Sequence, residues 1–416
     1  MRLGYYAHHH GSGHCRQADK LAGLLSAQGF NPNELLTVFT STPKEDYSFS
    51  HLQDSQVIRL PDEHEDPSDL LPGRAGSYWQ PASMHYSPVG NSTIQLRSLM
   101  LIEQIAKRRI ELMIIDLSVE VALLCRVSSI PYLYVRLPGE RDDTPHLNAF
   151  AGAIGLLAAY PKCLEVSTTP DWVKQKTLYL GFLSSDSDSN SQSPLARFRQ
   201  PLNKADFAKQ LLGDFDELLA DSFSKPAFNA PIITVIKGFG GHERIDDELD
   251  KLRQALPKAL IISLGPIKDN AKQFVDIAIQ VDDVTPFLQH SDVLIMACGL
   301  NSIAEACQSM TIATPLVVIP DERPHREQEM MADGLIASGR AIGFEAFLAQ
   351  ISLLGSDASS FSKLLAFKSN ANLQAQLQAS IAEDFITSIG DADSAKVWFY
   401  NWLLPRLELV PERRSD

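Results

Sequence analysis

The sequence has few cysteines, no long apolar run and no excess of basic residues. Its five cysteines include no Cys-x-x-Cys pair, which argues against a zinc framework and is typical of a reducing compartment. No stretch approaches the roughly 18 consecutive apolar residues of a membrane span. The first ten residues lack the apolar core of a signal peptide. The sequence therefore predicts a cytoplasmic protein without a transmembrane segment.

Acidic residues outnumber basic ones. The 51 Asp and Glu against 37 Lys and Arg give a formal net charge of −14. This balance argues against a nucleic-acid partner, because binding to a phosphate backbone needs a basic surface. It still allows a small phosphate ligand, which backbone N–H groups at a helix N-terminus can bind without net positive charge.

The pattern of apolar segments predicts an α/β protein with two Rossmann-like domains that face each other across a cleft. At 416 residues the chain is too long for one ordinary core. Segments with helical periodicity separate short apolar strands, which indicates parallel sheets. The expected strands include residues 3–7, 35–39, 111–116, 132–135, 178–183, 232–236, 259–264, 293–296 and 315–319. The polar stretch 43–89 shows little periodicity and predicts a long excursion over the cleft.

A serine- and aspartate-rich run, S-S-D-S-D-S-N-S-Q-S at 184–193, contains no apolar residue that could pack. It predicts an N-terminal domain over residues 1–183 and a linker with a connecting helix over 184–230. The second domain is expected over residues 231–390, followed by an aromatic-rich helix within 391–416. Ligands bind at the carboxyl ends of parallel strands, so the motifs that follow strands are the candidate site.

The first such motif is the turn H-G-S-G-H-C-R at 10–16. It is not the dinucleotide-binding G-x-G-x-x-G, because Arg16 stands at the third glycine position. Gly13 lets the backbone approach a ligand, and His14 can accept a proton from a hydroxyl group at neutral pH. The alternative is a structural turn with a surface histidine. A zinc site made from the histidines at 8, 9, 10 and 14 is disfavoured, because consecutive histidines on an extended segment point to opposite sides.

The second motif, K-G-F-G-G-H at 237–242, follows the strand that opens the second domain. Its glycines, Gly238, Gly240 and Gly241, can present N–H groups to a diphosphate.

The third motif, A-C-G-L-N-S-I-A-E at 297–305, opens a helix after an apolar strand. Glu305 comes four residues after Asn301 and three after Ser302, so these side chains share one helix face. A carboxylate there can accept both hydroxyls of a ribose while the helix N-terminus binds phosphates. The same spacing also fits a capping box with Ser302 as the N-cap, and both interpretations are compatible.

The fourth motif, P-D-E-R-P-H-R-E-Q-E-M-M-A at 320–332, also follows a strand. Acid and amide side chains at the start of a helix are suitable partners for sugar hydroxyls. A solvated charged surface is the alternative.

Together these motifs resemble those of the GT-B glycosyltransferases. Residues 297–305 are similar to the H-C-G-W-N-S-x-x-E signature of nucleoside-diphosphate-sugar transferases, and G-S-G-H-x-x-R is similar to the opening of MurG-like transferases. The likeness spans about residues 1–343. The positions that match the family are Gly299, Asn301, Ser302, Glu305, Glu327 and Gln328.

The resemblance implies transfer of a hexose from a nucleotide-diphosphate sugar, preferably a UDP-sugar, to an acceptor hydroxyl. A single displacement that uses a general base would invert the configuration, and helix termini would stabilise the leaving diphosphate in place of a metal. No cofactor is expected. The aromatic-rich C-terminal helix would cross back to the N-terminal domain. The acceptor is left open between a glycolipid, a polysaccharide precursor and a small molecule.

The resemblance also implies a role for each matching residue. Glu305 would hold the ribose. Asn301 and Ser302, with the loop from Gly238 to Gly241, would hold the diphosphate. Glu327 and Gln328 would orient the sugar. His14 would face the anomeric carbon as a base or as an electrostatic partner of the leaving group, and Asp116 would orient a histidine or the acceptor.

The sequence departs from the family at two signature positions. Ala297 replaces a phosphate-binding histidine and Leu300 replaces a tryptophan. His242 and Arg244 are candidates to supply the missing charge. The alternatives are therefore a nucleotide-sugar hydrolase or 2-epimerase on the same fold, and a non-catalytic protein that binds a nucleotide sugar.

Overall fold

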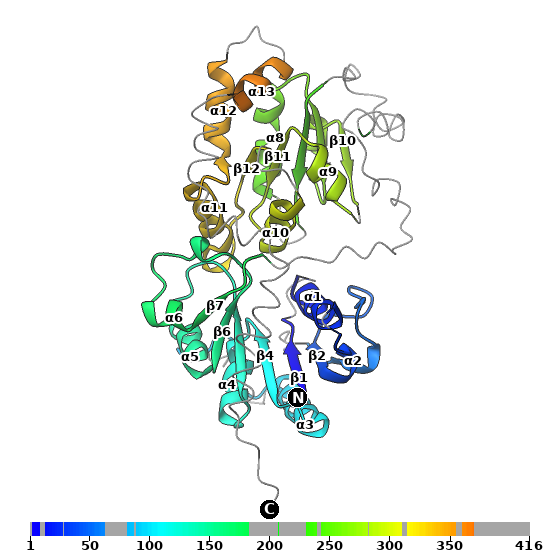
Figure 1. Cartoon of the computed structure of the whole chain (residues 1–416), viewed down its shortest axis with the longest axis vertical. Helices are drawn as coiled ribbons and strands as arrows, with labels where there is room; N and C mark the ends of the chain where they lie inside the picture. Colours follow the sequence, from blue (N-terminus) through cyan, green and yellow to red (C-terminus); the bar gives the residue numbers. More distant parts are fainter. Residues whose placement is uncertain are drawn as a thin grey trace, which may run out of the picture.

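In the computed structural model the chain forms two parallel β-sheets, each covered by helices on both faces (Figure 1). The structure describes residues 2–8, 13–27, 29–62, 81–86, 89–182, 207, 230–238, 243–281, 283–309, 314–354 and 360–369. The two-domain α/β fold predicted from the sequence is thereby confirmed.

The first sheet has seven strands in the order β3-β2-β1-β4-β5-β6-β7. Its strands are β1 (Leu3–Tyr6), β2 (Leu36–Thr40), β3 (Val57–Arg59), β4 (Leu112–Asp116), β5 (Tyr132–Arg136), β6 (Gly155–Ala158) and β7 (Thr177–Tyr179). The helices of this domain are α1 (Gly13–Ala27), α2 (Pro32–Leu35), α3 (Ser92–Arg108), α4 (Val119–Val127), α5 (Thr144–Gly152) and α6 (Asp171–Lys176), with short 3-10 helices η1 (Asp54–Gln56) and η3 (Lys162–Leu164).

The second sheet has six strands in the order β10-β9-β8-β11-β12-β13. Its strands are β8 (Ile232–Ile236), β9 (Leu260–Leu264), β10 (Ile277–Ile279), β11 (Val293–Met296), β12 (Leu316–Val318) and β13 (Ile342–Gly343). Its helices are α8 (Glu243–Ala255), α9 (Thr285–His290), α10 (Leu300–Ser309), α11 (Glu327–Ala337), α12 (Phe344–Leu353) and α13 (Ser360–Ser369), with 3-10 helices η5 (Lys272–Phe274) and η6 (Pro324–Arg326).

Each strand supplies the cores on both sides of its sheet because successive side chains point to opposite faces. In β1, Tyr5 packs with Ala18 and Ala22 of α1, whereas Tyr6 packs with Leu101 and other residues of α3 and α4 on the other face. The second sheet is similarly buried between α9, α10 and α11 on one face and α8, α12 and α13 on the other.

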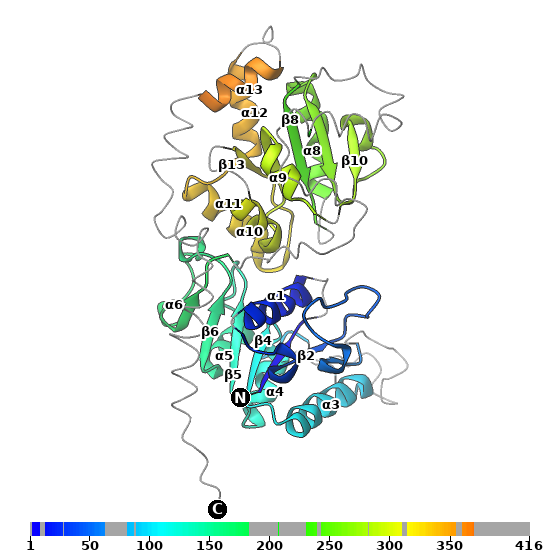
Figure 2. The ribbon, with the colours of Figure 1, turned by 45° about the vertical axis from the view of Figure 1, so that its right-hand side comes forward.

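In both sheets the order of strands reverses beside the first strand. β1 lies between β2 and β4, and β8 lies between β9 and β11. A reversal of this kind leaves a crevice at the carboxyl ends of the two strands, where ligands of open α/β sheets bind. Figures 1 and 2 show these ends turned toward one another, with α10 and α11 of the second domain next to α1 and the β6–β7 edge of the first.

An apolar contact also joins the two domains. Tyr160, Leu164 and Phe182 of the first domain belong to the same buried cluster as residues of α10 and α11. A β-carbon added to Gly334 in α11 would lie 2.9 Å from Leu164 Cδ2, so the two surfaces meet closely.

Some sequence predictions were wrong or fall outside the described residues. The excursion over residues 43–89 contains β3, which pairs in parallel with β2. The last strand of the first domain, predicted at 178–183, is β7 at Thr177–Tyr179. Most of the predicted linker and its helix, and all of the aromatic C-terminal helix, lie outside the described residues. Among the helices that the structure describes, none is both long and apolar enough to cross a membrane.

Candidate active site between the two domains

The N-terminal ends of α1 and α10 meet directly across the domain boundary. Gln17 Nε2 donates a hydrogen bond of 2.5 Å to Asn301 Oδ1. A β-carbon added to Gly13 would lie 3.3 Å from Asn301 Nδ2. The starts of α1 and α10, separated by almost 300 residues in the sequence, therefore form one site.

His14 and Asp116 form a buried pair at the strand reversal of the first sheet. His14 Nδ1 lies 2.9 Å from Asp116 Oδ2, and their side chains are 13% and 1% exposed. Tyr5 donates its hydroxyl proton to the same oxygen at 2.9 Å. Asp116 Oδ1 is buried and has no hydrogen-bond partner among the described residues. When the Nδ1–H of a neutral His14 donates to the carboxylate, Nε2 carries no proton and is an acceptor.

The environment of His14 favours its protonated form. Burial lowers the pKa of His14, but the charge of Asp116 and its hydrogen bond outweigh burial, so the pKa is raised above its ordinary value. The ring of His8 lies edge-on to that of His14, with 5.7 Å between the ring centroids.

Glu305 lies on α10 and faces the same helix that carries His14. It is half-buried, and burial raises the pKa of its carboxyl group. The charges of Lys20 and Arg16 on α1 oppose that effect. His14 and Glu305 thus lie along one interface between α1 and α10.

The start of α10 differs from a capping box. Ile303 N–H donates to Gly299 O at 3.0 Å, so Gly299 is the N-cap and Ser302 lies within the first turn. The interpretation of Ser302 as N-cap is therefore wrong. Apart from Gly299 and its two chain neighbours, no described atom lies within 4 Å of the position of a β-carbon on Gly299, which leaves this side of its backbone open to a ligand.

The Glu327–Gln328 pair at the start of α11 makes contacts within the protein. Glu327 Oε2 accepts a hydrogen bond of 3.1 Å from Arg141 of the first domain. Burial raises the pKa of the Glu327 carboxyl group, against the opposing charges of Arg141 and His14. Gln328 is buried and its Oε1 accepts from the Asp321 N–H at 2.9 Å. Glu327 is thus near His14, whereas Gln328 stabilises the loop after β12.

The loop after β8 is described only in part. Gly238 follows β8 and is half-buried, while Gly240, Gly241 and His242 lie outside the described residues. Lys237 is buried and its Nζ donates to Asp246 at 2.5 Å. The lysine of this motif is therefore engaged within its own domain.

Arg244, at the start of α8, makes hydrogen bonds within the second domain. Its Nη1 donates to Pro320 O at 3.1 Å, and its N–H donates to Asp321 at 3.1 Å. Arg244 therefore joins the start of α8 to the loop after β12. Ala297, at the end of β11, is buried.

Arg141 and a group of histidines beside it were not among the residues predicted from the sequence. Arg141 lies between Glu327 and His146, and its Nη1 is 3.2 Å from His146 Nε2. Burial and the charge of Arg141 lower the pKa of His146 to about 3. Only one local signal was present: Asp143 precedes His146 by three residues, the spacing of a helix N-cap.

The sequence matches no family model and no curated protein. Solved structures nevertheless share its architecture. The match to the spinosyn forosaminyltransferase SpnP covers 98% of both chains at 11% identity, with a TM-score of 0.57. MurG from Acinetobacter baumannii matches at 12% identity over 91% of this chain and 99% of its own, with a TM-score of 0.51.

A UDP-GlcNAc 2-epimerase from Neisseria meningitidis, bound to UDP-GlcNAc, matches at 11% identity over 97% of this chain and 100% of its own, with a TM-score of 0.50. These likenesses define the class of architecture: the chain has the GT-B fold, as the sequence motifs predict.

Proposed function

We propose that this chain is a glycosyltransferase that moves a sugar from a nucleotide-diphosphate sugar to an acceptor hydroxyl. The observation that carries the proposal is the buried contact of His14 with Asp116 where α1 meets α10. Glycosyltransferases of the same fold support the reaction class. The UDP-GlcNAc in the epimerase structure supports a UDP-sugar as the donor.

His14 acts as the general base. Its Nε2 accepts the proton of the acceptor hydroxyl as that oxygen attacks the anomeric carbon. The bond from the anomeric carbon to the diphosphate breaks, and its electron pair leaves with the nucleotide. Asp116 stabilises the imidazolium that forms. A single displacement of this kind inverts the anomeric configuration.

The donor is held by the start of α10 and the loop that begins at Gly238. The N–H groups of the first turn of α10, near Asn301 and Ser302, stabilise the departing diphosphate without a metal ion. Glu305 holds the ribose. Glu327 and Gln328 orient the sugar, which requires Glu327 to exchange Arg141 for sugar hydroxyls.

In this proposal residues 1–183 bind the acceptor and residues 231–390 bind the donor. Residues 184–230 connect the two domains, and the helix within 391–416 packs back on the first. We also propose that the protein acts in the cytoplasm.

A 2-epimerase or hydrolase is the second candidate, favoured by the internal contacts of Glu327 and Gln328 and by the epimerase of the same fold. Incubation with the donor alone separates the two. Release of free sugar, or appearance of its epimer, without an acceptor supports the second candidate and contradicts the first.

The proposal is tested with a panel of UDP- and TDP-sugars and acceptors, with mass spectrometry of the products. We expect a glycosylated acceptor, and we expect His14→Ala to lower kcat by about 10²–10⁴-fold because the base is lost. His51→Ala, a histidine of the same domain outside the site, is the matched control. A loss below tenfold in His14→Ala excludes the base role, and donor binding with no turnover on any acceptor indicates a binding protein.

A further inference from the structure

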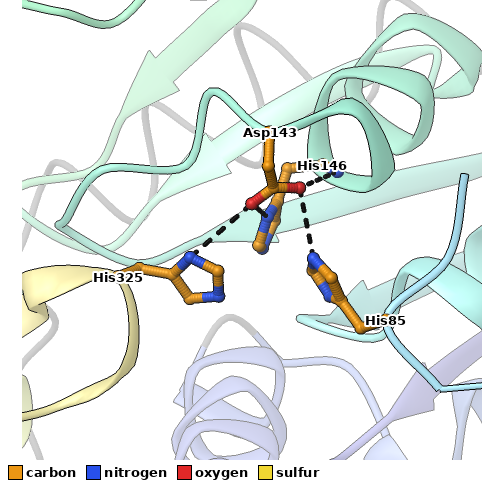
Figure 3. A group of neighbouring side chains, drawn as sticks. All are labelled: His85, Asp143, His146 and His325. Atoms are coloured by element: carbon orange, nitrogen blue, oxygen red, sulfur yellow. Dashed lines mark hydrogen bonds and ion pairs between the residues drawn. The ribbon is translucent and has the colours of Figure 1, made fainter. Parts of the chain in front are cut away.

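Four side chains from three separate segments converge between the domains (Figure 3). His85 lies in the segment 81–86, Asp143 is the N-cap of α5 and His146 lies in its first turn, and His325 lies in η6 of the second domain. One nitrogen or oxygen atom from each lies within 4.8 Å of the others.

Asp143 is the centre of this cluster. Its Oδ2 lies 2.7 Å from His146 Nδ1 and 3.6 Å from His325 Nδ1, and its Oδ1 lies 3.1 Å from His85 Nε2. Zn–N and Zn–O bonds of about 2.0–2.2 Å place tetrahedral ligand atoms about 3.3 Å apart. The two distances from Asp143 Oδ2 bracket that separation, while His85 contacts the other carboxylate oxygen. The ligand atoms all lie within 4.8 Å of one another, so the widest pair would close by at most about 1.5 Å.

The backbone around the cluster is built to hold these side chains in place. Glu120 accepts hydrogen bonds from the N–H groups of His85 and Tyr86, at 2.8 and 2.9 Å. His325 has a left-handed backbone, with a φ of 59°, which a non-glycine residue keeps only where its surroundings enforce it.

The enforcement of His325 comes from the opposite domain. Its carbonyl oxygen accepts the Glu140 N–H at 2.8 Å. The same oxygen lies 2.6 Å from the position of a β-carbon on Gly139, whose own φ is +115°. Only glycine at 139 permits this approach, so contacts across the domain boundary present His325 to the cluster.

We propose that His85, Asp143, His146 and His325 bind one divalent first-row transition-metal ion, for which Zn²⁺ is the best fit. Three imidazoles and one carboxylate suit zinc, whereas Mg²⁺ and Ca²⁺ prefer oxygen ligands throughout. Four protein ligands complete a tetrahedron, so the site is structural and takes no part in sugar transfer. Three ligands come from the first domain and one from the second, so the ion joins the domains.

The ion also changes the partners of Arg141. With a metal on Nδ1, neutral His146 carries its proton on Nε2, and it can no longer accept the hydrogen bond from Arg141. Arg141 then keeps Glu327 of the second domain until the hydroxyls of the proposed sugar replace it. Metal binding and this interdomain ion pair therefore favour the same arrangement of the domains.

The test is direct metal binding to the full chain after chelator treatment. Zn²⁺ is titrated in competition with a chromophoric chelator, and Co²⁺ is added separately to record its visible spectrum. We expect one tightly bound Zn²⁺ and the absorption of tetrahedral Co²⁺. His85→Ala and His325→Asn should each weaken binding by at least about 100-fold, because even the loss of an outer partner costs about 10–100-fold. Asparagine is chosen at 325 because it tolerates the left-handed backbone.

The control is the double variant His9→Ala/His10→Ala, which removes other histidines that could take up metal and should bind Zn²⁺ as the unaltered chain does. Equal affinity in His325→Asn and the unaltered chain overturns the proposal, as does loss of binding in the control alone. An octahedral Co²⁺ spectrum or absence of binding to the unaltered chain also overturns it, and this measurement needs no variant to fold.

Discussion

Replacement of Asp116 by asparagine separates two effects of one carboxylate on His14. The variant keeps the shape of the side chain and removes its charge. Unit charges 2.9 Å apart interact by about 5–6 kcal/mol at an effective dielectric constant of about 20. Because burial of both groups opposes this attraction, we expect a net loss of about 3–5 kcal/mol from the transition state, where His14 carries the proton. This loss lowers kcat by about 10²–10⁴-fold.

The same substitution shifts the pH dependence in a defined direction. In the unaltered protein Asp116 raises the pKa of His14 above 6.5, so the neutral base accumulates only as the pH rises through that raised value. In Asp116→Asn only burial remains as the main influence, and burial lowers the pKa of His14. The acidic limb of the pH–rate profile should therefore move to lower pH while the plateau falls.

The assay is kcat/KM for transfer between pH 5 and 9, with Tyr5→Phe as the matched control. Tyr5 donates to the same Asp116 oxygen but does not change its charge, so its loss should cost less than tenfold. An Asp116→Asn variant that keeps its rate within tenfold, or whose acidic limb moves to higher pH, refutes the reasoning.

Three further outcomes are expected. Gly139→Ala should lower the free energy of unfolding by about 1–3 kcal/mol in urea titrations, because its φ is +115° and its β-carbon would clash with His325 O; an unchanged midpoint contradicts this. Glu305→Gln should raise the Kd for the nucleotide about tenfold by calorimetry, because a charged acceptor for the ribose is lost; equal affinity removes Glu305 from that role. The His14–Asp116 pair contributes stability that is fully present below pH 6.5 and is lost as the pH rises through the raised pKa of His14. The difference in Tm between the unaltered protein and Asp116→Asn should therefore shrink above that pKa. A Tm difference that grows with pH contradicts the pairing.

The sequence alone predicted those strands and helices whose own residues show a strong hydrophobic pattern. β11 is a continuous apolar run and β8 is interrupted only by Thr234, and the predicted bounds of both match the structure. By contrast, β3 has three residues and β13 has two, which is too short for a period of two to emerge. The strand conformation of β3 depends on pairing with β2, and that of β13 depends on pairing with β12. Neither partner is adjacent in the sequence, so the local pattern does not reveal the pairing.

The site could be predicted in part because its residues follow strands. His14 and Asp116 were separate candidates, and their contact arises because β1 pairs with β4 in parallel, with Tyr6 opposite Ile115. Arg141 could not be found in this way, because its partner Glu327 lies 186 residues away and no spacing rule relates them. The cluster of His85, Asp143, His146 and His325 could not be predicted either, because its members come from three segments that no spacing rule relates.

The hydrogen bond from Gln17 to Asn301 has a consequence for ligand affinity. Gln17 of the first domain already donates to the side-chain amide oxygen of Asn301, which lies in the segment that we propose for binding of the diphosphate. If the proposed donor pairs with that side chain, it displaces Gln17, and its apparent Kd is the intrinsic value divided by the fraction of molecules in which the bond is open. Gln17 thus competes with such a ligand for Asn301. A ligand that contacts both domains would offset the free energy lost when the hydrogen bond between Gln17 and Asn301 breaks.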